Sequence, residues 1–437
     1  MRIGIHTFGC KVNQYDTEAL AHLLRERGHE VTEQEEDVDV FIVNTCAVTG
    51  ESERKARQYL RKIAKTNPGV RLVVTGCYSQ TSPQELTEIE GVSLITGVKD
   101  RSRLVDLIEN LRPAKAPAIQ VDDWSDQERM DWNAADFPSK TRAFLKIEDG
   151  CSAYCSYCKI PYARGPVRSL TPQQAVKEFK RLLDLGHAEI VLTGIHLGCY
   201  GHDLGIGLEE ILRAVDGFSG QYRFRLSSVE PSDFSPAVME AIADAEHLCP
   251  HLHIPLQSGC NSVLKRMNRH YTTDDYARIV RDLRQVRPGL AVTTDVITGF
   301  PGETDEEARE TFEFIESQRF SDLHVFPFSP RVGTAAFRMS GQISRRLKHQ
   351  RVQALIGLAQ KMATEFQREM IGKTVEVLIE EANLQGGEGL TGEYIRAWVD
   401  GEVTPGSLVA ANVTDQADDR LISLLNLNTE SLRPTAE

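Results

Sequence analysis

The sequence has no hydrophobic run that approaches the roughly 20 apolar residues needed to span a bilayer. Its start, Met1 to His6, lacks the apolar stretch and the small-residue cleavage site of a secretory signal peptide. No internal repeat or low-complexity tract is evident. These absences argue against membrane-spanning, secreted and repeat-built proteins, and we expect a cytoplasmic protein.

Basic residues are in the minority, with 50 Lys and Arg against 63 Asp and Glu and a formal net charge of −13. This balance usually argues against a polyanionic partner. A local basic stripe can still bind phosphate, because salt screens charges beyond about 8 Å. Aromatic residues make up only 7%, but 41% of residues are hydrophobic, which excludes a mainly disordered or fibrous chain. At roughly 150 residues per domain, 437 residues predict about three domains.

The nine cysteines are an odd number in a chain without an export signal, which argues against a disulfide framework. Three of them, Cys151, Cys155 and Cys158, lie in one short segment. Three thiolates in one loop can hold three irons of a [4Fe–4S] cube and leave the fourth open to a substrate. Zinc is the main alternative, but structural zinc sites want four protein ligands, and catalytic sites rarely use three cysteines so closely spaced.

The first hundred residues alternate apolar runs with helical patterns. The patterns predict strands at Arg2–His6, Val40–Asn44 and Leu72–Thr75, and helices at about Tyr15–Arg27, Glu51–Lys65 and Pro83–Ile89. This βαβα order predicts an α/β domain with a parallel sheet.

Three further cysteines, Cys10, Cys46 and Cys77, each come just after one of these predicted strands. Because the carboxyl ends of parallel strands share one edge of a sheet, the three loops can meet, and the following helix N-termini favour an anionic cluster there. Three thiolates would again leave one iron open. The alternative is that the three cysteines are small buried hydrophobes.

Residues 113–140 are rich in Pro and Asp without a sustained period and are predicted to be a linker. Six strands follow, at Ala143–Ile147, Glu189–Thr193, Tyr222–Ser227, His251–Leu256, Ala291–Ile297 and Leu323–Phe328, with helices between them. Thr171 before Pro172 and the Thr304–Glu307 spacing are typical helix starts. The repeated βα order predicts a partial barrel of about six units, with its chemistry at the carboxyl ends of the strands.

A helical pattern over Ser344–Met370 ends this part of the chain, and short β-rich runs broken by glycines predict a small β-barrel after it. We therefore expect a domain at residues 1–112, a linker at 113–140, a barrel domain at 141–370 and a β-barrel domain at 371–437.

The segment Cys151-Ser152-Ala153-Tyr154-Cys155-Ser156-Tyr157-Cys158 resembles the CxxxCxΦC loop of the radical S-adenosylmethionine superfamily, in which Φ is aromatic and corresponds to Tyr157. The resemblance implies that the open iron binds S-adenosylmethionine and that the reduced cluster cleaves it to a 5′-deoxyadenosyl radical. Thr193 and Gly194 occupy the place of the superfamily's amino-group contact, and Asp295 lies in the segment Thr294–Gly299, which ends another strand that faces the cofactor. We expect Tyr157, Thr193, Gly194 and Asp295 to contact the cofactor.

The segments Gly9-Cys10-Lys11-Val12-Asn13-Gln14, Asn44-Thr45-Cys46-Ala47-Val48-Thr49 and Gly76-Cys77 resemble the signature of the methylthiotransferases, a family within that superfamily. The resemblance covers nearly the whole chain. It implies an auxiliary [4Fe–4S] cluster on Cys10, Cys46 and Cys77 and a C-terminal TRAM-type β-barrel. Because the radical-forming cluster must have a low reduction potential, we expect a flavodoxin or ferredoxin as electron donor. We expect Cys199, Cys249 and Cys260 to be packing residues.

Four segments resemble the branch that acts on carbon-2 of threonylcarbamoyladenosine next to the tRNA anticodon, namely His6–Tyr15, Ile160–Gly165, Leu192–His196 and His270–Thr273. The substrate carboxylate needs a cation, for which Arg164 and Arg168 are candidates, and a surface or interdomain ion pair is their alternative role. Rival functions are isopentenyladenosine modification in tRNA, modification of a ribosomal-protein aspartate, and an iron–sulfur RNA-binding protein without turnover.

Two basic groups could track RNA phosphates, although a solvated helix face is the alternative for each. They are Lys265, Arg266, Arg269, Arg278, Arg281, Arg284 and Arg287, and then Arg345, Arg346, Lys348 and Arg351. The C-terminal β-barrel has four basic against twelve acidic residues, so charge is a poor means for it to hold RNA. Aromatic contact through Tyr394 or Trp398, or docking onto the barrel, is the alternative.

Overall fold

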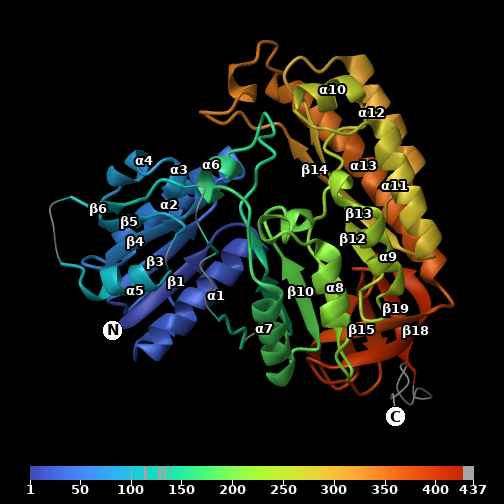
Figure 1. The fold of residues 1–437 in the computed structure, drawn as a ribbon, viewed down its shortest axis with the longest axis horizontal. Coiled ribbons are helices and arrows are strands. Elements are labelled where there is room, and N and C mark those ends of the chain that lie inside the picture. Colours follow the sequence, from blue (N-terminus) through green and yellow to red (C-terminus); the bar gives the residue numbers. More distant parts are fainter. Residues whose placement is uncertain (100, 113–115, 126–128, 131–133, 139, 427–437) are drawn as a thin grey trace. The chain divides into compact units, whose positions relative to one another are not determined.

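The computed structural model describes residues 1–99, 101–112, 116–125, 129–130, 134–138 and 140–426 (Figure 1). The chain divides into two compact units. The N-terminal unit comprises Met1–Phe137, Lys146–Leu170 and Ser329–Phe337, and the barrel unit comprises Pro138–Leu145, Thr171–Phe328 and Arg338–Glu437. Parts of the predicted linker (113–115, 126–128, 131–133 and 139) and of the predicted C-terminal domain (427–437) lie outside the described residues.

The N-terminal unit is built on a six-stranded parallel sheet of order β2-β1-β3-β4-β5-β6. The strands are β1 (Arg2–Thr7), β2 (Glu30–Thr32), β3 (Val40–Thr45), β4 (Arg71–Gly76), β5 (Val92–Thr96) and β6 (Ala118–Gln120). The predicted parallel sheet and its three predicted strands are confirmed. The edge strand β6 lies in the predicted linker, because three residues are too few to show a strand period.

Helices cover both faces of this sheet. They are α1 (Lys11–Glu26), α2 (Gly50–Thr66), α3 (Cys77–Thr81), α4 (Gln84–Thr87) and α5 (Arg101–Glu109). Strand residues alternate between the faces, so that Phe41 and Val43 pack with α2, α3 and α4. Val40 and Ile42 pack with α1 and α5 on the other face. Helix α1 begins four residues before its predicted start, with Cys10 at its N-cap position and no side-chain capping bond there.

The barrel unit contains all six strands predicted for the partial barrel. They are β7 (Arg142–Lys146), β10 (Glu189–Thr193), β11 (Arg223–Leu226), β12 (His251–His253), β13 (Ala291–Thr298) and β14 (Asp322–Pro327). They form two three-stranded sheets, β11-β10-β7 and β12-β13-β14, with a parallel bridge from Phe224 to Leu248 between them. The intervening helices are α7 (Pro172–Asp184), α8 (Leu208–Asp216), α9 (Pro236–Asp244), α10 (Asn261–Arg266), α11 (Thr273–Val286) and α12 (Asp305–Gln318). The predicted partial (βα)6 barrel is confirmed.

The predicted helix starts follow capping chemistry. Thr171 and Gln174 form a capping box at α7, and Thr304 and Glu307 form one at α12. Ser344 caps α13 (Arg345–Met370), the long helix that precedes the C-terminal β-barrel. Within the described ranges, no helix combines the length and the apolar character needed to cross a membrane.

The C-terminal segment is a closed five-stranded barrel of order β15-β16-β17-β19-β18, as predicted. Its strands are β15 (Thr374–Ala382), β16 (Gly386–Thr391), β17 (Arg396–Asp400), β18 (Leu408–Ala417) and β19 (Arg420–Leu425). Alternate residues such as Val375, Val377 and Ile379 fill its interior.

A buried ion network joins this small barrel to the (βα)6 barrel inside the barrel unit. Glu189 on β10 accepts hydrogen bonds from Arg223 Nε at 2.6 Å and Arg225 Nε at 3.1 Å. Arg223 also donates to the carbonyl oxygens of Glu376 and Leu390, both at 2.8 Å. Tyr394 lies 4.9 Å from the Arg225 guanidinium, so this aromatic residue docks the small barrel.

Glu189→Gln is expected to destabilise the protein by roughly 3–5 kcal/mol, because it leaves two buried guanidinium groups without their carboxylate. Burial opposes ionisation of Glu189, but Arg225 and Arg223 outweigh it and lower its pKa to about 2. The ion network therefore contributes stability above pH 4.5, the ordinary value, and loses it as the pH falls toward 2. Urea unfolding between pH 7 and pH 3 measures both effects.

Glu316→Gln is the matched control, since its partner Lys361 is exposed and a solvent-exposed ion pair contributes little to stability. Equal unfolding free energies for Glu189→Gln and Glu316→Gln at pH 7 would contradict the importance of the buried network.

Candidate functional site

Three cysteines meet at the carboxyl edge of the N-terminal sheet, where β1, β3 and β4 are neighbours. Cys46 directly follows β3, Cys77 directly follows β4, and Cys10 lies three residues after β1. A Cβ added to Gly9 would lie 2.9 Å from Cys46 Cβ and 3.1 Å from its Sγ, so the first two loops touch. Gly9 also has a φ of +117°, which favours glycine. The expected meeting of the three loops is present in the structure.

Asn13 ties these loops together, although the sequence analysis assigned it no role beyond its place in the motif. Its fully buried side chain donates from Nδ2 to the carbonyl oxygens of Phe8 at 2.8 Å and Thr45 at 3.0 Å. Those carbonyls lie just before Cys10 and Cys46. The amide oxygen of Asn13 lies 3.8 Å from Cys77 Sγ, so one side chain touches all three loops.

Burial shapes the chemistry of these thiols. It raises the pKa of Cys46 to about 12, with a further rise from Cys77 and an opposing effect from the Val48 N–H, 3.4 Å from the sulfur. Burial also raises the pKa of Cys77, against the opposing charge of Arg164. Such thiols keep their protons until a metal displaces them, because a coordinating thiol is deprotonated outright.

The second set of cysteines lies in a loop that its own backbone shapes. Gly150 has a φ of +102°, and a Cβ there would lie 1.9 Å from the Pro166 carbonyl oxygen. Cys151 N donates to Gly165 O at 2.9 Å, and Cys158 N donates to Cys155 O at 2.9 Å. The sulfurs of Cys151 and Cys158 accept backbone N–H groups at 3.5 and 3.4 Å.

Both sets fit an iron–sulfur cluster. None of the nine cysteines, all of which are described, forms a disulfide. Each set offers three sulfur donors, which suits a [4Fe–4S] cube with one open iron. Backbone N–H groups donate to sulfurs in both sets, and such bonds favour the thiolate form.

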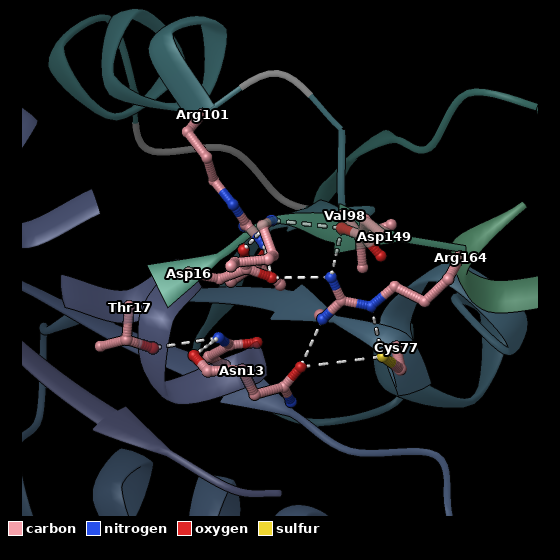
Figure 2. A network of polar contacts seen from close by, with 12 residues as sticks. Asn13, Asp16, Thr17, Cys77, Val98, Arg101, Asp149 and Arg164 are labelled. Atoms are coloured by element: carbon pink, nitrogen blue, oxygen red, sulfur yellow. Dashed lines mark hydrogen bonds and ion pairs between the residues drawn. The ribbon is translucent and has the colours of Figure 1, made fainter. Parts of the chain in front are cut away.

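Arg164 (Figure 2) and Arg168, the candidates for the substrate carboxylate, are both buried in the N-terminal unit. Arg164 Nη1 donates to Asp16 at 2.8 Å and to Asp149 at 3.0 Å. Arg168 donates to the Arg164 carbonyl oxygen at 2.9 Å and lies 4.2 Å from the Trp124 ring. The Arg164 pairs are therefore buried within the N-terminal unit, neither at the surface nor between units, and the substrate contact of both arginines stays a prediction.

The four predicted cofactor contacts divide between the units. The half-buried Tyr157 belongs to the N-terminal unit, whereas Thr193, Gly194 and Asp295 belong to the barrel unit. Thr193 is the last residue of β10 and is buried, and Asp295 lies within β13.

Two histidines that the sequence analysis missed hold Asp295. His253 Nε2 lies 3.3 Å from one carboxylate oxygen and His324 Nδ1 lies 3.2 Å from the other. Burial opposes ionisation of Asp295, but the two histidines hold its pKa below the ordinary value. For His253 the alternation His251-Leu252-His253 within a strand was the available signal, because it places two histidines on one side of the sheet.

The three remaining cysteines differ in burial. Cys249 and Cys260 are buried, as expected of packing residues. Cys199 is only partly buried, and its ligand atom lies within 4.8 Å of those of His196 and Asp233. His196 Nε2 also lies 2.9 Å from Asp233 Oδ2.

The first basic group, between Lys265 and Arg287, is largely engaged in contacts within the protein. Arg266 binds Glu307 at 2.7 Å, and Arg269 binds Glu230. Arg287 donates to three backbone carbonyls, of Ile242, Ala245 and Leu248. These contacts favour a structural role for much of this group over a phosphate-binding stripe.

Comparison with known proteins matches two family models, one described as Uncharacterized protein family UPF0004 (residues 2–97) and one as the Radical SAM superfamily (residues 145–315). The chain is 43% identical over 385 residues to the threonylcarbamoyladenosine tRNA methylthiotransferase MtaB of Bacillus subtilis, covering 87% of this chain and 85% of that protein. It is 35% identical over 410 residues to MtaB of Aquifex aeolicus, covering 94% and 99%.

A tRNA-2-methylthio-N(6)-dimethylallyladenosine synthase from Moorella thermoacetica is 34% identical over 400 residues, covering 89% of each chain. Among solved structures, the fold is similar to that of the radical S-adenosylmethionine methyltransferase TsrM from Kitasatospora setae. The TM-score is 0.57 at 15% identity, covering 89% of this chain and 80% of that chain.

The partial barrel, the CxxxCxΦC loop and the matching superfamily model define a radical S-adenosylmethionine protein. Identities of 34–43% over most of the chain refine this class. The chain belongs to the methylthiotransferase family, and its cofactors are S-adenosylmethionine and two [4Fe–4S] clusters.

Proposed function

We propose that this protein adds a methylthio group to carbon-2 of N6-threonylcarbamoyladenosine at tRNA position 37, next to the anticodon. The observation that carries this proposal is the meeting of Cys10, Cys46 and Cys77 at one sheet edge, in addition to the loop of Cys151, Cys155 and Cys158. The choice of nucleoside is supported by 43% identity to a threonylcarbamoyladenosine enzyme, against 34% to a dimethylallyladenosine enzyme.

In this proposal Cys10, Cys46 and Cys77 hold the auxiliary cluster, and Cys151, Cys155 and Cys158 hold the cluster that binds S-adenosylmethionine. Tyr157, Thr193, Gly194 and Asp295 contact S-adenosylmethionine. When bound, the two clusters supply reductive radical chemistry and a place for the sulfur that is transferred.

The chain's own residues then ligate the clusters, orient the groups around them and exclude water. Burial of Cys46 and Cys77 keeps water away from that edge of the sheet. Asn13 holds the loops of Cys10 and Cys46 at a fixed separation through its two backbone bonds. His253 and His324 fix the rotamer of Asp295 and keep it ionised.

The proposal also covers partners and organisation. We expect flavodoxin or ferredoxin as electron donor, a cytoplasmic location, and the anticodon loop as the part of tRNA that is bound. The functional segments are the methylthiotransferase domain at 1–112, the linker at 113–140, the radical domain at 141–370 and the TRAM-type barrel at 371–437. The contacts of Arg164 and Arg168 with the substrate carboxylate stay a prediction.

Mass spectrometry of nucleosides tests the proposed function. The reconstituted protein is incubated anaerobically with dithionite, S-adenosylmethionine and tRNA that carries threonylcarbamoyladenosine. We expect a product heavier by one methylthio group in place of one hydrogen, together with 5′-deoxyadenosine. The same tRNA without its threonylcarbamoyl group is the matched control and should remain unmodified.

Two parallel substrates separate the family's branches. tRNA that carries isopentenyladenosine and the small-subunit ribosomal protein are offered under the same conditions. A methylthio product on either of these, with none on threonylcarbamoyladenosine, would overturn the proposed substrate. Absence of 5′-deoxyadenosine with all three would overturn the proposed radical chemistry and favour a binding protein.

A further inference from the structure

A buried polar network connects the two cysteine-bearing segments of the N-terminal unit (Figure 2). Asp16 on α1 accepts from Lys146 Nζ at 2.6 Å and from Arg164 Nη1 at 2.8 Å. Asp149, just before the second cysteine loop, accepts from the same two cations at 3.2 and 3.0 Å. All four side chains are at most 7% exposed, so these interactions are shielded from water.

Arg164 is the member of this network that reaches a cysteine sulfur. Its Nε donates to Cys77 Sγ at 3.2 Å, and its Nη2 donates to Asn13 Oδ1 at 2.6 Å. Each nitrogen of the planar guanidinium therefore has its own partner. Nε donates to the sulfur, Nη1 donates to the two carboxylates and Nη2 donates to the amide oxygen. A planar fork with five N–H groups can do this, whereas a lysine ammonium cannot.

The hydrogen bonds that Arg164 makes around Cys77 can persist when Cys77 becomes a ligating thiolate. A thiolate cannot donate to Asn13, yet the Asn13 oxygen keeps the hydrogen bond from Arg164 Nη2. The Nε–H bond to the sulfur becomes stronger once the sulfur is negative, because both partners are then charged. The Asn13 oxygen therefore still has a donor when Cys77 ligates a metal.

Arg164 also connects the two sites along the chain. It is the last residue of α6 (Ile160–Arg164), the helix that begins two residues after Cys158. Its side chain contacts Cys77, 87 residues away in the sequence. Displacement of the second cysteine loop would therefore move the guanidinium that orients Cys77.

We propose that Arg164 is a positioning residue of the auxiliary cluster: it orients Cys77 Sγ for ligation and raises the reduction potential of that cluster. This inference rests on the proposed ligation by Cys10, Cys46 and Cys77. Hydrogen bonds to cluster sulfurs and nearby charge set the potential, and a donor with a positive charge favours the reduced, more negative state. The side-chain hydrogen bonds of Arg164 go to Cys77, Asp16, Asp149 and Asn13.

The test uses the full chain with Cys151, Cys155 and Cys158 replaced by alanine, so that only the auxiliary cluster is present. Arg164→Gln and Arg164→Lys are made in this parent chain and reconstituted anaerobically. Three quantities are measured: iron and sulfide per chain, the midpoint potential by spectroelectrochemical titration, and the rate of iron release to a chelator. Circular dichroism checks that each variant is folded.

Arg164→Gln is expected to shift the midpoint potential to a more negative value and to release iron about 10- to 100-fold faster than the parent. Arg164→Lys should show a smaller shift in the same direction, because it keeps the charge but loses the Nε–H bond. If Arg164→Gln does not fold, Arg164→Lys is compared with the parent in its place.

Lys146→Gln is the matched control, since Lys146 binds the same two carboxylates as Arg164 and, among its described hydrogen bonds, none goes to sulfur. Lys146→Gln should stay close to the parent in its midpoint potential and in its rate of iron release. Parent-like values for both Arg164 variants, or equal shifts for Lys146→Gln and Arg164→Gln, would overturn the role of Arg164. A parent chain that holds no cluster would instead overturn the ligation by Cys10, Cys46 and Cys77.

Discussion

Cys155→Ala is expected to abolish both 5′-deoxyadenosine and the methylthio product. The middle cysteine of the CxxxCxΦC loop is one of three thiolates assigned to the cluster that binds S-adenosylmethionine, and two thiolates in this loop would not hold the cube. Liquid chromatography with mass spectrometry measures both products in one anaerobic reaction. The iron content should fall from about eight to about four atoms per chain, since each cube holds four.

Cys260→Ala is the control for this loss. Cys260 is buried and lies outside both sets of cysteines, and its replacement by alanine removes one sulfur, as Cys155→Ala does. It should keep both products and all of the iron. Formation of 5′-deoxyadenosine by Cys155→Ala at the rate of the unchanged protein would contradict the assignment of this loop.

Cys10→Ala is expected to eliminate the methylthio product while 5′-deoxyadenosine is still formed. Cys10 is exposed, so its replacement removes a ligand without opening a cavity in the core. The chain should again hold about four irons, now on the other set of cysteines. The measurement is the ratio of methylthio nucleoside to 5′-deoxyadenosine, which should fall to zero.

Cys46→Ala and Cys77→Ala should give the same product ratio, because each removes one of three equivalent ligands. A methylthio product from Cys10→Ala would contradict a role for the sheet-edge cysteines in the transfer. Loss of 5′-deoxyadenosine as well would show that the two sites are not independent.

Local patterns predicted most of the elements. The strands β1, β3 and β4 and the barrel strands β7, β10, β11, β12, β13 and β14 were all predicted, because each is an apolar run or an alternation of apolar and polar residues. The capping boxes at Thr171 and Thr304 marked two helix starts, since both partners lie within four residues. The start of α1 was placed too late because Cys10 is not a residue that commonly caps a helix.

Domain organisation followed the sequence less closely. The predicted linker contributes β6 to the N-terminal sheet, and Trp124 within it packs on Arg168. The loop of Cys151 to Cys158 follows β7 of the barrel along the chain but belongs to the N-terminal unit. Compact units are formed by contacts between segments that lie far apart in the sequence. Local periodicity gives no information about those contacts.

The sequence alone predicts the two sets of cysteines and their cluster chemistry: one set by its short spacing, the other by its position after parallel strands, whose carboxyl ends must meet. The side chains that surround these cysteines became known from the folded chain. Asn13 joins the loops of Cys10 and Cys46, and Arg164 turns its charge toward Cys77 and Asp16 instead of solvent. The reason is physical: Arg164 and Asp16 are 148 residues apart, and the partner of a buried charge is chosen by the packing of the folded chain.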